Sequence, residues 1–246
     1  MNRAVMVVVG AALLALPPPA GAAPQSRCVE CHFANFSDVP AREHLGDWAQ
    51  SAHAKHGVGC EWCHGGDAST FVPADAHKGV VGSGNAASWV YRSNLPRTCA
   101  PCHAGETQAF ARSFHNTLLS QGDDRRAPTC SSCHGAMRAR VPSPAALENE
   151  CAGCHTASSP RAAYPVLARL AVEQIAEVRT TLEHVQYRLQ KMKDPEARQR
   201  LWAQQTLAIA TLNGAAEAFH SFDFTTVAER LRLARQRADE LDRQTR

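Results

Sequence analysis

The chain has 246 residues, with 26 basic against 23 acidic side chains and 20% charged residues in all. This near balance argues against a polybasic nucleic-acid-binding protein and against a charged disordered tail. Between Cys28 and His155, only 18 of 128 residues (14%) are Leu, Val or Phe, and none is Ile. A segment of this composition cannot bury a core of its own side chains. We therefore expect it to be either disordered or packed around something that is not protein.

The first 22 residues have the features of an export signal. A basic start at Arg3 precedes an apolar run of 13 residues, and small residues lead up to Ala22. The run is shorter than the roughly 20 residues of a membrane-spanning helix, which disfavours the alternative of a retained anchor. We expect cleavage after Ala22, a mature protein in the periplasm, and no membrane span after that cleavage.

All ten cysteines belong to five copies of the pattern Cys-x-x-Cys-His, which is the attachment signature of c-type haem. The two thiols reach the two vinyl groups of one haem, and the histidine that follows supplies the proximal iron ligand. Structural zinc, a dithiol redox pair and a disulfide scaffold are alternatives, but none of them requires a histidine after every pair. We expect five covalently bound haem c groups, held by Cys28, Cys31 and His32; Cys60, Cys63 and His64; Cys99, Cys102 and His103; Cys130, Cys133 and His134; and Cys151, Cys154 and His155.

The linkers between motifs are short, with 32, 39, 31 and 21 residues from each motif start to the next. Linkers of this length hold the haems close together, which predicts a continuous electron path through a domain that spans residues 23–160. The porphyrins would form the apolar core of this domain, so the segment without haem should be unfolded.

Seven histidines outside the motifs are candidates for the sixth, distal iron ligand. Only Met137 and Met192 remain after signal removal, so His/Met ligation cannot dominate and mostly bis-histidine haems are expected. Two candidates, His53 and His115, lie in a Ser-x-His pattern, on helices predicted for residues 40–56 and 106–121. The expected distal ligands are His53, His77, His115, His184 and His220, while His44 and His56 are reserves that could also be exposed or donate protons.

Residues 161–246 lack cysteine and read as about three helices that form a hairpin or bundle. Apolar positions alternate four and three apart along the first helix (Ala171, Ile175, Val178, Leu182, Val185, Leu189, Met192) and the third (Val227, Leu231, Ala234, Ala238, Leu241). The second helix, which Asp194 and Pro195 begin, carries Leu201, Trp202, Ile209, Leu212 and Phe219. Thr226 and Glu229 form a predicted capping box. The fold class is therefore mainly α with much irregular loop.

The motifs resemble those of exported multihaem cytochromes c related to hydroxylamine oxidoreductase and pentahaem nitrite reductase. The resemblance rests on Trp48, Ser51 and His53 before the second motif, on Ser113, Phe114 and His115 before the fourth, and on Phe219 and His220. It implies stacked haem pairs, bis-histidine iron and periplasmic electron transfer. The chain departs from the catalytic members, because no motif ends in Lys and no tyrosine (Tyr91, Tyr164, Tyr187) matches the one crosslinked to their catalytic haem.

We expect an electron carrier rather than a catalyst, and assign no catalytic residue. Its partner would be a quinol-oxidising membrane cytochrome or another periplasmic redox protein, and its C-terminal helices could form a homo-oligomer. The alternative is a reductase of nitrogen or sulfur oxoanions with one open haem. A haem-ligand sensor or assembly subunit is a weaker third hypothesis.

Overall fold

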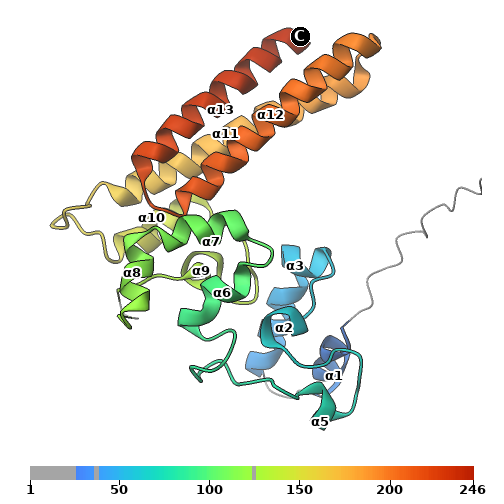
Figure 1. Cartoon of the computed structure of the whole chain (residues 1–246), viewed down its shortest axis with the longest axis vertical. Helices are drawn as coiled ribbons and strands as arrows, with labels where there is room; N and C mark the ends of the chain where they lie inside the picture. The colour runs from blue at the N-terminus through green and yellow to red at the C-terminus, as the bar shows by residue number, and fades with distance from the viewer. Residues whose placement is uncertain (1–25, 36–38, 124–125) are drawn as a thin grey trace, which may run out of the picture.

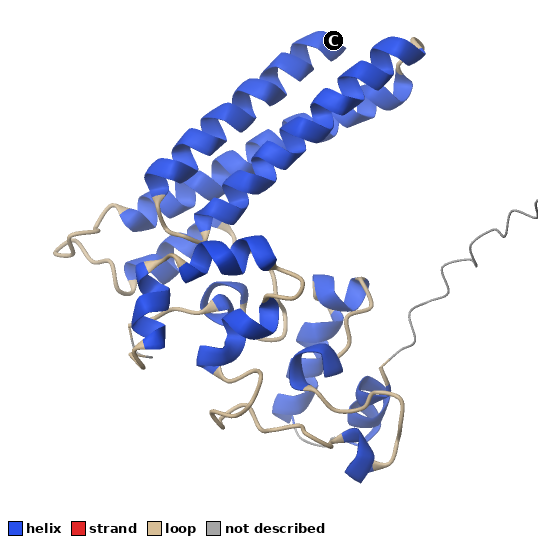
Figure 2. Cartoon of the chain, in the orientation of Figure 1, coloured by secondary structure: helices blue, strands red, loops and turns tan. Residues whose placement is uncertain are grey.

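The computed structural model describes residues 26–35, 39–123 and 126–246, and all regular elements in these ranges are helices (Figure 2). They are α1 (Arg27–Asn35), α2 (Val39–Ala49), α3 (Ala52–Lys55), α4 (Glu61–His64), α5 (Pro73–Ala76), the 3-10 helix η1 (Arg92–Asn94), α6 (Leu95–Cys99), α7 (Ala104–Ala111), α8 (Phe114–Ser120), α9 (Cys130–His134), α10 (Pro144–Ala152), α11 (Tyr164–Lys191), α12 (Pro195–Phe219) and α13 (Phe224–Thr245). The prediction of a mainly α fold with much irregular loop is confirmed.

The predicted export signal, residues 1–22, lies outside the described residues. Within the described ranges, none of the helices combines the length and the apolar character needed to cross a membrane.

The three long helices α11, α12 and α13 lie side by side and pack against one another (Figure 1). The shorter helices α7 and α10 contact this bundle, through α12 and α11 respectively. Gly105 of α7 allows a close approach to α12, because a Cβ atom there would lie 2.6 Å from the side chain of Glu217. The bundle and the motif-bearing region are therefore in direct contact.

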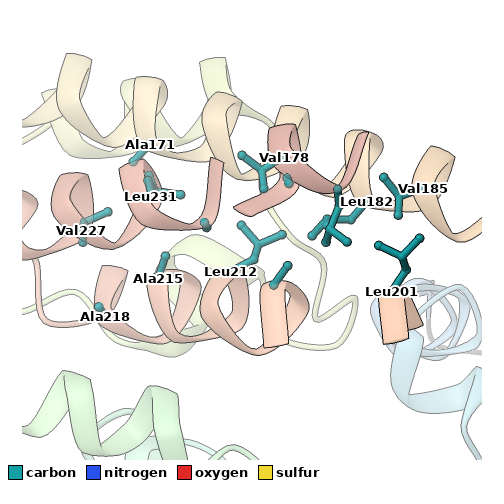
Figure 3. Close-up of a cluster of buried hydrophobic side chains, with 14 of the residues drawn as sticks. Ala171, Val178, Leu182, Val185, Leu201, Leu212, Ala215, Ala218, Val227 and Leu231 are labelled. Atoms are coloured by element: carbon teal, nitrogen blue, oxygen red, sulfur yellow. The ribbon is translucent and has the colours of Figure 1, made fainter. Parts of the chain in front are cut away.

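The bundle has a buried apolar core that follows the predicted seams of α11 and α13 (Figure 3). On α11 the buried seam residues are Ala171, Val178, Leu182, Val185 and Leu189, with Ile175 and Met192 packed at the edge of the core. All five predicted positions of α13 are buried as well. The heptad spacing thus located the buried face of two of the three helices.

The prediction for α12 needs correction, because Trp202 is 41% exposed and Ile209 is 38% exposed. The buried positions of this helix are Leu201, Gln205, Ala208, Leu212, Ala215 and Ala218. Alanines on this face let α12 approach its neighbours closely. The sequence prediction relied instead on the larger apolar residues Trp202 and Ile209, which lie next to the buried face. Gln205 is tolerated in the core because its Nε2 donates to the Leu182 carbonyl at 3.1 Å.

One predicted helix start is confirmed and another is wrong. Asp194 caps α12 as expected, since its side chain accepts hydrogen bonds from the backbone N–H groups of Glu196 and Ala197. The cap of α13 is Asp223 rather than Thr226, and its carboxylate accepts from the N–H groups of Thr225 and Thr226. Aspartate is as good a cap as threonine, and helix α13 therefore begins three residues earlier than predicted.

The motif-bearing region has little core of its own. Its buried apolar cluster consists of Phe110, Leu118, Leu119 and Ala127, with Phe222 packed against it. Several of its large apolar side chains are exposed instead, namely Phe33, Trp62, Phe71, Trp89 and Phe114. This distribution agrees with the expectation that the region packs around something other than protein.

Candidate haem-binding centres

Each Cys-x-x-Cys-His motif lies on a short helix or at its end. The first motif lies on α1, the second begins at the N-cap of α4, the third follows from the last residue of α6, the fourth makes up α9, and the fifth begins in the last turn of α10. On a helical turn, side chains three apart project to one side. The turn is closed by the histidine N–H, which donates to the carbonyl of the first cysteine at 2.9 Å in the second, third and fifth motifs. None of the ten cysteines, all of which lie in the described ranges, forms a disulfide, as covalent attachment of haem requires.

Four of the five motif histidines face a second imidazole from outside the motifs. The ring centres are 5.8 Å apart for His32 and His77, 6.0 Å for His103 and His53, 6.1 Å for His155 and His115, and 6.1 Å for His134 and His220. Two metal–nitrogen bonds of about 2 Å each, extended by roughly 1 Å from each nitrogen to its ring centre, account for a spacing of about 6 Å. The four pairs therefore fit one iron atom between each two rings.

Two of the facing histidines lie at the start of a helix, just after a serine cap. Ser51 Oγ accepts a hydrogen bond from the Ala54 N–H at 3.1 Å, and Ser113 Oγ accepts from the Asn116 N–H at 3.0 Å. These caps begin the separate helices α3 and α8. The prediction of single helices over 40–56 and 106–121 is therefore wrong, because each serine adopts an extended backbone and starts a new helix. The recurrent Ser-x-His pattern is thus a cap that positions His53 and His115.

The other two facing histidines end a helix. His77 is the C-cap of α5, and its Nδ1 lies 2.9 Å from the Pro73 carbonyl; His220 is the C-cap of α12, and its Nδ1 lies 3.0 Å from the Ala216 carbonyl. A ring that donates Nδ1–H to a carbonyl is held in one orientation and keeps Nε2 free for a metal. The same device holds the motif residue His134, whose Nδ1 is 2.9 Å from the Arg140 carbonyl.

Burial favours the neutral form of several of these imidazoles, which is the form that binds iron. The pKa of His115 is lowered to about 4, mainly by burial and further by the charges of His155 and Arg161. Burial also lowers the pKa of His53 and of His220. Within the described residues, Nδ1 of His115 is buried without a hydrogen-bond partner. A metal bond made by Nδ1 itself would give this atom a partner.

Consecutive motifs are neighbours in space. Burial raises the pKa of Cys60 and of Cys133 to about 11, and adjacent thiols of the preceding or following motif, Cys28 and Cys151, raise each of them further. The pKa of Cys63 is raised by burial and then by the thiols of the third motif. The neighbouring thiol of Cys130 in the fourth motif, followed by burial, raises the pKa of Cys99 in the third motif. The order of motifs in space therefore follows their order in the sequence.

The second motif differs from the other four, because no ring contacts His64 among the described residues. His64 instead lines a cavity of about 370 Å³ that also contains His44 and Met137 and extends to His32 and His77. No sequence spacing had pointed to Met137, which lies outside every predicted helix.

Two histidines singled out from the sequence lie elsewhere. His184 is on the exposed face of α11, and His56 is exposed at the C-terminal end of α3. The structure brings neither of them to a motif histidine.

Comparison with known proteins places this chain beside multihaem cytochromes. Residues 15–65 match the family model described as cytochrome c554 and c-prime. The chain is 28% identical over 113 residues to the C-type polyheme cytochrome OmcC of Geobacter sulfurreducens, and 33% identical over 117 residues to OmcB of the same species. Each match covers 44% of this chain, and 14% and 13% of OmcC and OmcB respectively, so the chain spans only a small part of these relatives.

No solved structure matches the chain. Taken with the five motifs and the facing imidazole pairs, the matches support a multihaem c-type cytochrome that binds haem c covalently.

Proposed function

We propose that the protein is a periplasmic pentahaem cytochrome that passes electrons along a chain of mostly bis-histidine haems. The observation that carries this proposal is the set of four imidazole pairs, each of which joins one motif histidine to one histidine from another segment. The packing of a helical protein does not by itself require pairs of facing imidazoles at this spacing.

The proposed ligands follow from these pairs. The ten motif cysteines would hold five haem c groups by thioether bonds, and the proximal ligands would be His32, His64, His103, His134 and His155. The distal ligands would be His77 opposite His32, His53 opposite His103, His220 opposite His134 and His115 opposite His155. His184, which is exposed on α11, leaves the proposed set.

Haem c supplies reversible one-electron chemistry, and the side chains around it set how that chemistry is used. Ligation by two imidazoles lacks the thioether that raises haem potentials, so most of the potentials should be low. It also leaves no position on the iron for a substrate, which favours a carrier over a catalyst. The neighbouring motifs from the first to the fifth would give short steps for electron tunnelling.

The finer points of organisation belong to the same proposal. Residues 1–22 would be a cleaved signal, residues 23–160 the haem domain, and residues 161–246 a helical domain that supplies His220 to the fourth motif. The partners would be a quinol-oxidising membrane cytochrome or another periplasmic redox protein, and the exposed bundle could form a homo-oligomer. A relationship to the hydroxylamine oxidoreductase and pentahaem nitrite reductase group is supported by the Ser-x-His and Phe-His patterns.

The test is to express the full chain with periplasmic haem attachment and to measure its intact mass and its EPR spectrum. The expected mass is that of the chain without its first 22 residues and with five haems. In the oxidised protein, at least four irons should be low-spin. Two or more high-spin irons would contradict the carrier assignment and favour an oxoanion reductase with open haems.

A further inference from the structure

Two side chains of kinds that can bind haem iron, an imidazole and a thioether, line the same cavity as His64. His44 lies on α2, and Met137 lies on the loop that follows the fourth motif; both line the same cavity as His64. The four other motif histidines each have a facing ring within 5.8–6.1 Å, whereas His44, although it lines this cavity, makes no ring contact with His64.

The loop that carries Met137 has a constrained conformation. Its ends are joined by two contacts between His134 and Arg140: the Arg140 N–H donates to the His134 carbonyl at 2.9 Å, and the His134 ring nitrogen is 2.9 Å from the Arg140 carbonyl. Ala139 has a φ of 40°, and it is one of two non-glycine residues with a positive φ in the described part of the chain. Strained backbone of this kind persists where surrounding contacts hold a side chain in a required place.

An ion pair attaches this loop to α2, the helix that contributes His44 to the cavity lining. Arg138, the residue after Met137, contacts Oδ1 of Asp47 on α2 through Nε at 2.8 Å and through Nη2 at 2.7 Å. The two residues are 91 positions apart in the sequence, so the contact fixes the loop after the fourth motif against the region of the second. Both side chains are about 40% exposed, and the pair therefore positions the loop more than it stabilises the fold.

Given the five haems of the proposed function, we propose that Met137 is the sixth ligand of the iron bound by His64. A thioether is uncharged and flexible, so it enters an apolar cavity at little cost and can reach an iron from a loop. Met192 packs against the core of the bundle, which leaves Met137 as the methionine of the described residues that is close to a motif. One haem of the five would then have His/Met ligation and a higher potential than the other four.

The experiment is a comparison of the oxidised holoprotein with its Met137→Leu variant. The native protein should show the weak far-red absorption of a thioether bound to ferric haem, and one of its five haems should be reduced at a distinctly higher potential. In Met137→Leu, both features should disappear while the mass still shows five haems. Met192→Leu is the matched control and should keep both features. Met137→His should restore a low-spin iron at low potential.

Two results would overturn the assignment. The first is a Met137→Leu protein whose far-red absorption and redox titration equal those of the native protein. The second is a His44→Ala variant in which one low-spin bis-histidine iron becomes high-spin, which would make His44 the ligand. A native protein that lacks haem at the second motif by mass would instead contradict the proposed function.

Discussion

At the scale of single residues, the candidate centres depend on how helix ends hold imidazoles. His53 and His115 follow buried serine caps, and His77 and His220 donate from helix C-termini to a carbonyl four residues back. Helix ends are where backbone groups lack partners within the helix, so side chains there are easily fixed by hydrogen bonds. The same ends allow a ring to project away from the helix and toward a motif on another segment.

Replacing His115 with Ala should leave five covalent haems and turn one iron from low-spin to high-spin, because the ring that faces His155 would be lost. EPR of the oxidised protein measures this change. His184→Ala is the control, since His184 is exposed on α11, and its spectrum should equal that of the native protein. An unchanged low-spin spectrum in His115→Ala would remove His115 from the ligand set.

Replacing Ser113 with Ala should lower the free energy of unfolding by about 1 kcal/mol, since the Asn116 N–H loses its partner at the start of α8. Denaturant unfolding followed by circular dichroism measures the loss. Ser120→Ala, at the exposed end of the same helix, should change stability by less than about 0.5 kcal/mol. Equal effects of the two variants would show that Ser113 is not an effective cap.

Much of the site could be predicted at this scale, and the part that could not has a clear cause. The Ser-x-His pattern pointed to His53 and His115 because the serine makes a local hydrogen bond that caps the helix, and the histidine lies two residues later. His184 was chosen because it lies off the apolar seam, but that position faces solvent once α12 and α13 pack against α11. The place of Met137 in the lining of the cavity that His64 also lines depends on tertiary contacts between distant segments and leaves no trace in local spacing.

At the scale of elements, the long helices and the short ones have different sources of stability. The long helices bury a continuous seam of Leu, Val and Ala, and its heptad spacing is visible in the sequence of α11 and α13. The short helices are set by serine caps and by the motif turns, and no periodicity predicts where they break. This difference explains why the buried faces of α11 and α13 were predicted, while the two helices expected over 40–56 and 106–121 were each split.

Leu212, which is 3% exposed on α12, should be a critical core position of the bundle. Leu212→Ala should lower the free energy of unfolding of the bundle by roughly 2–5 kcal/mol, because it leaves a cavity between three helices. Leu207, on the same helix and 55% exposed, is the matched control. Its change to Ala should cost less than about 0.5 kcal/mol in the same denaturant titration. Comparable losses in the two variants would contradict the arrangement of α12.

At the scale of the whole molecule, the apolar core is concentrated in one part. The main buried cluster belongs to α11, α12 and α13, while the motif-bearing region has a cluster of four buried residues and many exposed aromatic side chains. Without haem, the motif-bearing region has too little buried apolar surface to offset the conformational entropy that its chain loses on folding.

The full chain made without haem attachment should therefore fold only in its C-terminal part. Limited proteolysis should cut rapidly within residues 26–160 and leave a resistant fragment that contains residues 164–245. The helical signal of that fragment should persist in circular dichroism. The holoprotein is the control and should resist cleavage in both parts. A haem-free chain protected throughout would show that the motif region has a sufficient core of its own.

The four facing pairs also have a topological consequence, if each pair is closed by an iron atom. The closed loop from His32 to His77 contains His53, so it overlaps the loop from His53 to His103; likewise the loop from His115 to His155 contains His134, which opens the loop to His220. The iron atoms would thus close two sets of loops. The loops overlap within each set, and the two sets are joined by the stretch that contains α7.

An iron atom bound by both His64 and Met137 would be the one coordinate link from the first set to the second, since His64 lies within the first and Met137 within the second. The ion pair of Arg138 with Asp47 already spans the same divide. Without that link, a force that pulls the termini apart would separate two cross-linked segments at α7. With the link, all the loops belong to one cross-linked network.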